Sequence, residues 1–215
     1  MKPTTGRLHV LTDVVTQQRF DHLELARRAA AGGADVVQFR DKQLHTTRAL
    51  IEQAGAIMDA LATHACNLIV DDRVDVALAC GAGVHLGRDD LPATLARRVL
   101  GPDVIIGGTA NSLAEAVTVA RRGVDYLGVG PIFGTRSKAN PAPDMGLKTL
   151  AAIVDAVDVP VVAIGSITPE RIADVMGTGA HGVAVLSAVV MDPDPGAATA
   201  RCREALDAAL SRRTA

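Results

Sequence analysis

Two pairs of adjacent aspartates each follow a short apolar stretch of the chain. Asp71 and Asp72 come directly after residues 68–70, and Asp89 and Asp90 come soon after residues 84–86. Paired carboxylates concentrate negative charge, which suits Mg²⁺, a cation commonly held by one or two carboxylates together with phosphate oxygens and water. The alternative is that Asp71, Asp72 or Asp90 caps the helix that follows it. Both interpretations can hold for different members of each pair.

Two cations and an amide lie at the end of another apolar stretch, residues 36–40. Side chains alternate along a strand, so Gln38 and Arg40 share one face, and Lys42 follows at the rim. Such a group could clamp a polyphosphate and the edge of a heterocycle. The alternative is a rim of ion pairs with Asp41.

The elements that position these residues alternate regularly along the chain. Predicted strands are residues 8–11, 36–40, 68–70, 84–86, 104–106, 126–129, 161–164 and 183–186, and predicted helices include residues 22–31, 46–61, 111–122, 147–156, 169–176 and about 196–210. Gly33, Gly81, Gly123 and Gly179 are expected to end helices in a left-handed conformation. The pattern predicts a parallel eight-stranded (β/α)₈ TIM barrel in a single domain, residues 1–215. A doubly wound open sheet is the alternative, because strand order cannot be read from sequence.

In parallel barrels the functional residues lie at the carboxyl ends of the strands and in the loops that follow. Thr109 offers a hydroxyl after the fifth predicted strand, and Asn111 has the position of an N-cap. Ser166 and Ser187 follow the seventh and eighth strands, where barrels often bind a phosphate through backbone N–H groups. These loops predict a phosphate site.

Residues 130–146 interrupt the alternation with three prolines, three glycines and no helical periodicity. Long connections of this kind in compact domains are usually functional or disordered. Thr135, Arg136, Ser137 and Lys138 lie near the middle and predict a phosphate-handling lid. The sequence therefore predicts two phosphate sites, one of them with a metal, and a reaction that depends on positioning and charge neutralisation.

Composition excludes several other classes of function. The net charge is −2 and aromatic residues make up 2% of the chain, which argues against nucleic-acid binding. No apolar stretch approaches the roughly 18 residues that span a bilayer, and no secretory signal is visible, so a cytoplasmic location is expected. The six histidines show no catalytic pattern, and the three cysteines form neither a disulfide framework nor a metal motif. Homo-oligomerisation stays open.

Over nearly its whole length the sequence resembles the thiamine-phosphate synthase family, also called thiamine-phosphate pyrophosphorylase. The matching segments are residues 38–42, Asp71 and Asp72, residues 83–87 through Asp90, residues 128–132 with residues 135–138, and residues 164–167. The resemblance implies that a hydroxymethylpyrimidine diphosphate is joined to a hydroxyethylthiazole phosphate with release of pyrophosphate and with Mg²⁺ as cofactor. It also implies a dissociative, carbocation-like mechanism without a protein nucleophile.

The resemblance also implies roles for individual residues. Mg²⁺ ligands fall on Asp72 and Asp90, and stabilisation of the leaving pyrophosphate falls on Arg40, Lys42 and Lys138. Contacts to the pyrimidine diphosphate fall on Gln38, Phe39, Arg40, Asp41, Lys42, Asp71, Thr109 and Lys138. Contacts to the thiazole phosphate fall on Thr135, Arg136, Ser137, Ser166, Leu186 and Ser187.

Four of these positions depart from the usual family pattern: Asp71 replaces asparagine, Thr109 replaces serine, Ser137 replaces threonine and Ser166 replaces glycine. Only Asp71 adds a charge, which would repel a diphosphate unless it is protonated or offset by the metal or Arg40. Alternative functions are a thiazole tautomerase-like paralogue, another phosphosugar-type barrel isomerase, and a non-catalytic phosphometabolite sensor.

Overall fold

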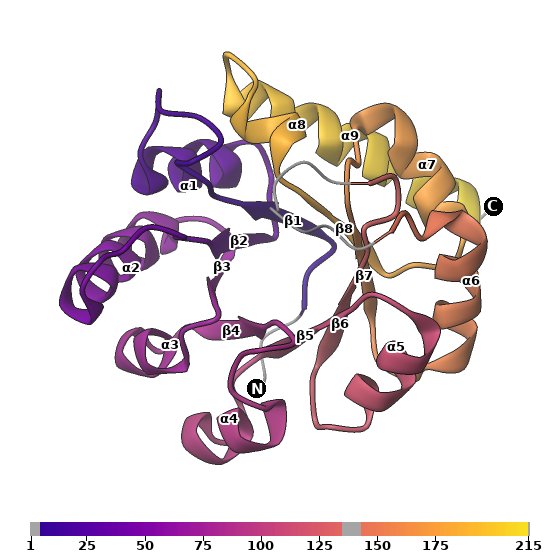
Figure 1. Cartoon of the computed structure of the whole chain (residues 1–215). Helices are drawn as coiled ribbons and strands as arrows, with labels where there is room; N and C mark the ends of the chain where they lie inside the picture. Colours follow the sequence, from indigo (N-terminus) through magenta and orange to yellow (C-terminus); the bar gives the residue numbers. More distant parts are fainter. Residues whose placement is uncertain (1–4, 135–142, 215) are drawn as a thin grey trace.

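The computed structural model describes residues 5–134 and 143–214, and within them eight parallel strands close into a barrel (Figure 1). Each strand pairs with the next one along the chain, and β8 pairs with β1, where Leu8 lies opposite Val183. The TIM-barrel prediction is therefore confirmed, and the open-sheet alternative is wrong. The strands are β1 (Leu8–Leu11), β2 (Val36–Phe39), β3 (Asn67–Asp71), β4 (Gly83–Leu86), β5 (Ile106–Ala110), β6 (Tyr126–Val129), β7 (Val161–Ile164) and β8 (Gly182–Val185).

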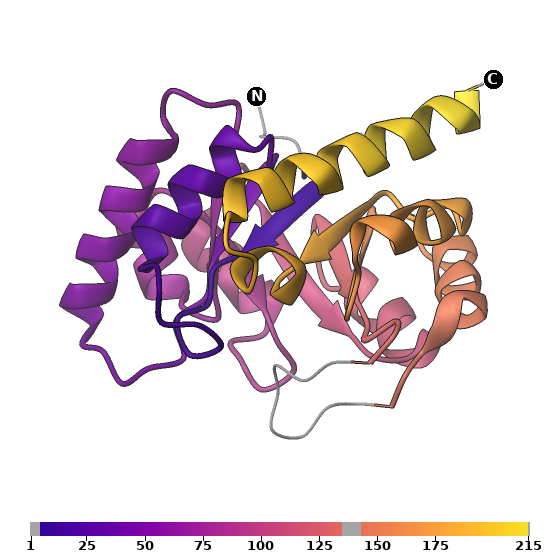
Figure 2. The same cartoon turned by 90° about the horizontal axis from the view of Figure 1, so that it is seen from above.

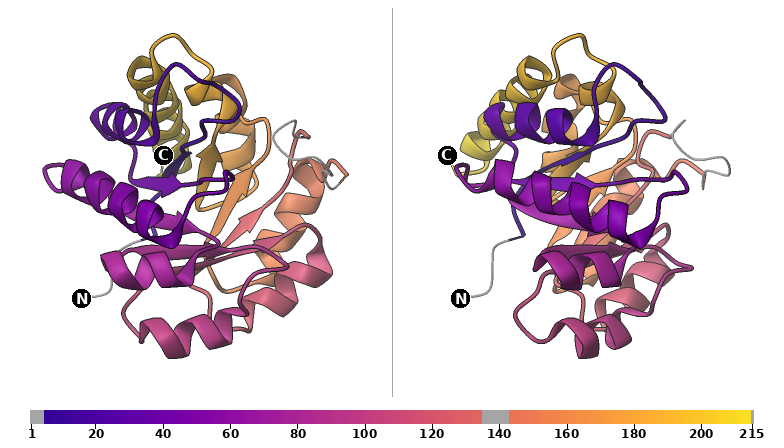
Figure 3. Two further views of the ribbon diagram at one scale, coloured as in Figure 1. Left: turned by 60° about the vertical axis from the view of Figure 1, so that its left-hand side comes forward. Right: turned by 90° about the vertical axis from the view of Figure 1, so that its left-hand side faces the viewer.

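Helices surround the barrel. The long α9 packs against both α1 and α7, while α1 also packs against α2 (Figures 2 and 3). In the part of the chain that the structure describes, no helix has both the length and the apolar character needed to cross a membrane. The helices are α1 (His22–Ala31), α2 (Thr47–Leu61), α3 (Val74–Cys80), α4 (Ala93–Leu100), α5 (Leu113–Ala120), α6 (Gly146–Ala156), α7 (Pro169–Gly177), α8 (Ser187–Val190) and α9 (Pro195–Thr214).

The strands are buried on both faces, which explains their β-branched and aliphatic composition. In β2, Val37 and Phe39 pack outward in the large core between barrel and helices. Val36 belongs to a second, smaller core together with Tyr126 and residues of other strands. The alternation predicted for Gln38 and Arg40 therefore directs both side chains away from the outer core.

The predicted bounds of β5 are wrong, because the strand runs over Ile106–Ala110 instead of residues 104–106. The predicted bounds placed Gly107 and Gly108 after the strand, but they lie inside it at points of close packing. A Cβ at Gly107 would lie 2.2 Å from Cζ of Tyr126, and one at Gly108 would lie 2.7 Å from Cγ1 of Val119. Thr109 consequently belongs to the strand and not to the loop.

The predicted N-caps are also wrong. Ser112, not Asn111, caps α5 by accepting a hydrogen bond from the backbone N–H of Glu115 at 3.2 Å. The helices α3 and α4 begin after Arg73 and Pro92, neither of which makes a side-chain cap, so the neighbouring aspartates are not caps. The expected left-handed glycines are confirmed, with positive φ at Gly33, Gly81, Gly123 and Gly179.

Candidate functional site

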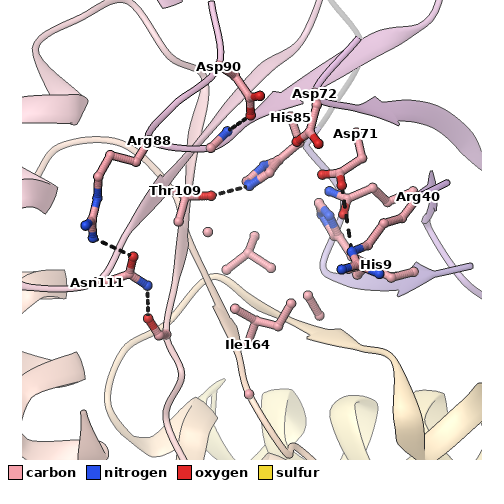
Figure 4. A pocket seen from close by; sticks show the side chains of 18 of the residues that line it. His9, Arg40, Asp71, Asp72, His85, Arg88, Asp90, Thr109, Asn111 and Ile164 are labelled. Atoms are coloured by element: carbon pink, nitrogen blue, oxygen red, sulfur yellow. Dashed lines mark hydrogen bonds and ion pairs between the residues drawn. The ribbon is translucent and has the colours of Figure 1, made fainter. Parts of the chain in front are cut away.

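A cavity of about 500 Å³ opens at the carboxyl ends of the strands, and residues from all eight strands or the loops that follow them line it. Figure 4 shows charged side chains gathered on one side of this pocket and aliphatic side chains on another. The lining residues are His9, Leu11, Gln38, Arg40, Lys42, Asp71, Asp72, His85, residues 87–90, Thr109, Asn111, Tyr126, Gly128, Gly130, Pro131, Val162, Ile164, Gly165 and Ala184.

Arg40 and Lys42, which line this pocket, form ion pairs with three aspartates, and two of these, Asp71 and Asp72, also line it. The Arg40 guanidinium binds the carboxylate of Asp13 and lies 3.8 Å from Oδ2 of Asp71. The Lys42 ammonium lies 2.8 Å from Oδ2 of Asp71 and also contacts Asp72. The cationic group that the sequence predicted is therefore assembled, but its carboxylate partners are not Asp41.

The pKa values of these groups reflect burial and mutual charge. Burial and the neighbouring charge of Asp72 raise the pKa of Asp71, although Lys42 and Arg40 oppose both effects. Burial favours the neutral form of Asp72 as well, but its contacts with Lys42 prevail and lower its pKa. The pKa of Lys42 is raised because attraction to Asp71 and Asp72 exceeds the effect of burial.

The two predicted Mg²⁺ ligands lie together. Asp72 and Asp90 share a side-chain hydrogen bond, and burial together with this contact raises the pKa of Asp90 to about 6. Two carboxyl groups that compete for one proton suit a cation, which would replace that proton. Within the described residues no three acidic, histidine or cysteine side chains form a metal cluster. The donor set thus fits Mg²⁺ held by two carboxylates, with substrate oxygens and water completing its shell.

Polar residues also lie deep in the barrel interior, where Gln38 and Thr109 were predicted from the sequence but His9, His85 and Tyr126 were given no functional role. Nδ1 of His85 lies 3.0 Å from the Tyr126 hydroxyl, and its Nε2 lies 2.9 Å from Oγ1 of Thr109. Gln38 also hydrogen-bonds the Tyr126 hydroxyl. The His9 ring packs edge-on against the Tyr126 ring, with the ring centroids 5.3 Å apart. Ordinary structural roles were expected for His9 and His85, but both line the pocket.

Several predicted substrate contacts have side chains elsewhere. Phe39 points into the outer core and packs edge-on against His22, so it does not line the pocket. The Asp41 carboxylate faces away from Arg40 and Lys42 and lies 2.6 Å from Nδ1 of His45. Both positions follow from strand alternation, which turns odd-numbered side chains of this segment away from the barrel interior.

The predicted thiazole-phosphate residues lie beside the pocket or outside the described chain. Ser166 follows β7 and donates its hydroxyl to the carbonyl of Gly134 at 3.0 Å, while Leu186 and Ser187 follow β8. None of these three is among the pocket-lining residues. The remaining contacts predicted for the lid, Thr135, Arg136, Ser137 and Lys138, lie outside the described residues.

Backbone conformation marks two of the predicted site residues. Among the residues that the structure describes, Asp72 and Ser166 are the non-glycine residues with positive φ, at 64° and 48°. This conformation is uncommon for residues with a side chain, and it tends to cluster at functional sites.

Asp13 was not predicted as a site residue. It follows the carboxyl end of β1, just as Asp71 lies at the carboxyl end of β3. Its Oδ1 accepts backbone N–H groups of Val15 and Thr16 at 2.9 and 2.7 Å, and its other oxygen holds Arg40. Applying the strand-end rule to the first strand would have found it.

The model of the thiamine monophosphate synthase family matches residues 10–189 of the chain. The chain belongs to this family. A thiamine-phosphate synthase of Salinibacter ruber is 50% identical over 95% of this chain and 90% of its own length. One from Methanoculleus marisnigri is 47% identical over 94% of this chain and 96% of its own length.

The fold agrees with the sequence relatives. The solved structure of thiamine phosphate pyrophosphorylase from Pyrococcus furiosus superimposes with a TM-score of 0.86 at 38% identity, covering 95% of this chain and 96% of that one. 3-Hexulose-6-phosphate synthase, at 20% identity and a TM-score of 0.66, shares the fold alone.

Proposed function

We propose that the chain is a transferase that joins 4-amino-2-methyl-5-hydroxymethylpyrimidine diphosphate to 5-hydroxyethyl-4-methylthiazole phosphate, giving thiamine phosphate and pyrophosphate. The observation that carries this proposal is the match to thiamine-phosphate synthases over nearly the whole chain. The pocket supports it, because two cations and a pair of adjoining carboxylates gather where a diphosphate and its metal would bind.

Arg40 and Lys42 would bind the diphosphate. Both already contact carboxylates, so the incoming phosphate oxygens would share these cations with Asp13, Asp71 and Asp72. These ion pairs hold the cations in place before the substrate arrives, which reduces the reorganisation required during reaction. The predicted contribution of Lys138 to the same group rests on the family resemblance.

Asp72 and Asp90 would hold Mg²⁺ on the side of the pocket next to Lys42. Bound there, Mg²⁺ supplies neutralisation of the charge that the leaving pyrophosphate gains. Arg40 and Lys42 contribute to the same stabilisation as fixed positive charges on the protein.

The reaction needs no nucleophile from the protein. The bond between the exocyclic methylene carbon and the diphosphate oxygen breaks, and its electron pair leaves with pyrophosphate. The aminopyrimidine stabilises the cationic methylene, and the thiazole nitrogen donates its lone pair to that carbon. The protein's part is to keep the two substrates in line and to exclude water. Ser166, Leu186 and Ser187, with the residues predicted for the lid, would hold the thiazole phosphate opposite.

The relatives described above are synthases, which favours this reaction over that of a tautomerase-like paralogue. A non-catalytic sensor would have no need for two cations placed against a carboxylate pair.

Release of pyrophosphate tests the proposal. Wild-type protein should release it only when both substrates and Mg²⁺ are present. Lys42→Met should lower kcat/KM on the order of a hundredfold or more, because a charge that stabilises the leaving group is lost. Lys148→Met, which removes an exposed lysine of α6, is the matched control and should behave as wild type. Absence of release despite calorimetric binding of either substrate would instead favour the tautomerase or the sensor.

A further inference from the structure

Four polar side chains from four strands form a continuous hydrogen-bonded chain across the floor of the pocket. It runs from Gln38 of β2 through the hydroxyl of Tyr126 in β6 and the imidazole of His85 in β4 to the hydroxyl of Thr109 in β5. The His85 contacts measure 3.0 and 2.9 Å, which are ordinary hydrogen-bond lengths. All four residues line the pocket, and the two at the ends of this hydrogen-bonded chain, Gln38 and Thr109, keep hydrogen-bonding groups that are not used within it.

Glycines in two neighbouring strands make room for this chain. In the strand register His85 lies opposite Gly107, and Gly107 lies opposite Tyr126. A Cβ at Gly107 would lie 2.2 Å from Cζ of Tyr126 and 2.5 Å from Nδ1 of His85, and one at Gly128 would lie 2.8 Å from Cε1 of His85. Glycine inside a strand costs stability, so its placement beneath both rings indicates that the rings need these positions.

This hydrogen-bonded chain of four side chains allows only two consistent directions of donation when the imidazole is neutral, because one ring nitrogen then donates and the other accepts. If the Tyr126 hydroxyl donates to Nδ1 of His85, the Gln38 amide N–H donates to the Tyr126 oxygen. The Gln38 carbonyl oxygen then faces the pocket as an acceptor. At the other end Nε2–H donates to Thr109, whose own hydroxyl hydrogen is left to donate to the pocket.

In the opposite direction every role is exchanged. Thr109 donates to Nε2 of His85, Nδ1–H donates to Tyr126, and the Tyr126 hydroxyl donates to the Gln38 carbonyl oxygen. Gln38 then offers an N–H donor to the pocket, and Thr109 offers an acceptor. A mixed arrangement either sets two acceptors against each other or directs both neighbouring N–H groups at the Tyr126 oxygen, which leaves the Tyr126 hydroxyl hydrogen without an acceptor among these four residues. An unsatisfied buried polar group costs about 1–3 kcal/mol.

We propose that Tyr126 and His85 are positioning residues that make Gln38 and Thr109 present opposite hydrogen-bonding roles, one donor and one acceptor, to the bound heterocycle. The proposal rests on the proposed function, since it assigns the heterocycle to the aminopyrimidine. That ring carries a donor, the exocyclic amine, next to an acceptor, the ring nitrogen. A coupled donor and acceptor would fix its orientation, with the methylene carbon held toward the second substrate.

Tyr126→Phe tests the proposal, because it keeps the ring over Gly107 and removes only the hydroxyl. Calorimetry with the pyrimidine diphosphate and MgCl₂ should show binding weakened about tenfold in Tyr126→Phe and about tenfold in Thr109→Val. The double variant should be weakened by much less than the product of the two, because both changes break one chain. If the affinity of the double variant is weakened by the full product of the two single factors, the proposed coupling is overturned.

A second measurement needs neither substrate nor turnover. Nitrogen NMR of the His85 ring in labelled protein should show one neutral tautomer in the wild type and a mixture of both tautomers in Tyr126→Phe. A doubly protonated ring in the wild type, or a ring signal unaffected by the variant, would overturn the proposal. A wild type that binds no pyrimidine diphosphate but shows the single tautomer would contradict the proposed function instead.

Thr199→Val is the matched control for loss of a buried hydroxyl. Thr199 is fully buried in α9, donates its hydroxyl to the carbonyl of Pro195 at 2.8 Å, and is not among the pocket-lining residues. This variant should lose stability yet keep both the affinity for the pyrimidine diphosphate and the His85 ring signals. An equal effect on affinity would assign the Tyr126 result to general destabilisation and overturn the proposal.

Discussion

His9 makes the stability of this fold depend on pH, because its imidazole is buried inside the barrel. The residue is 1% exposed, packs against Tyr126, and places Nε2 2.6 Å from the carbonyl oxygen of Thr5. Burial lowers the pKa of His9 from 6.5 to about 4, and the hydrogen bond to Thr5 offsets only part of this effect. The folded protein therefore keeps His9 neutral where an exposed histidine would already be charged.

Between pH 6.5 and about pH 4 the unfolded chain binds a proton at His9 that the folded protein does not bind. The free energy of unfolding therefore decreases as the pH falls through this window, and the loss is complete below it. With about 1.4 kcal/mol for each pKa unit, the loss from this residue is about 2 kcal/mol at about pH 5 and about 3 kcal/mol below pH 4.

Urea unfolding of the wild type and His9→Gln checks this value. Between about pH 7.5 and about pH 5, the free energy of unfolding of the variant should decrease by about 2 kcal/mol less than that of the wild type. Other titrating groups are common to both proteins and cancel in the comparison. If the two proteins lose the same free energy to within about 0.5 kcal/mol, the buried neutral state of His9 is refuted.

Three further outcomes are expected. Gly107→Ala should lower the free energy of unfolding in urea by about 2 kcal/mol or more, because its Cβ would lie 2.2 Å from the Tyr126 ring; an unchanged midpoint contradicts this packing. Asp71→Asn should tighten calorimetric binding of the pyrimidine diphosphate about fivefold, since it removes a buried charge that repels the phosphates; weaker binding would count against that reasoning. Burial raises the pKa of Cys66 to about 12 and of Cys202 to about 11. Both thiols should therefore react with iodoacetamide at least about 100-fold more slowly at about pH 8 in native than in urea-unfolded protein, and equal rates would exclude such burial.

The barrel was predictable because its strands and helices differ strongly in composition and alternate without interruption. The bounds predicted for β1, β6, β7 and α1 agree with the structure. The bounds of β5 were predicted wrongly because the reason for its two adjacent glycines, Gly107 and Gly108, lies in contacts with residues more distant in the sequence. Gly107 is required by the Tyr126 ring and Gly108 by Val119, and neither contact is visible in a local window.

The charged part of the candidate site was predictable for a related reason. Charged side chains at strand ends stand out against apolar strands, so Arg40, Lys42, Asp72 and Asp90 could be selected, and the structure brings them to one pocket. The floor of the pocket was not predictable. Since both faces of a barrel strand are buried, alternation does not reveal which face lines the interior. A residue such as His85 therefore looks like any other buried histidine.

The pairing of β1 with β8 has a consequence for synthesis of the chain. The barrel closes only when Leu8 pairs with Val183, a residue far along the sequence. Until then the sheet has two free edges. A nascent chain emerging from the ribosome therefore exposes an unpaired β1 edge until β8 has been made, and α9 can dock between α1 and α7 only after that. Protection by chaperones during translation should matter more for this chain than for a protein of equal length whose contacts are local.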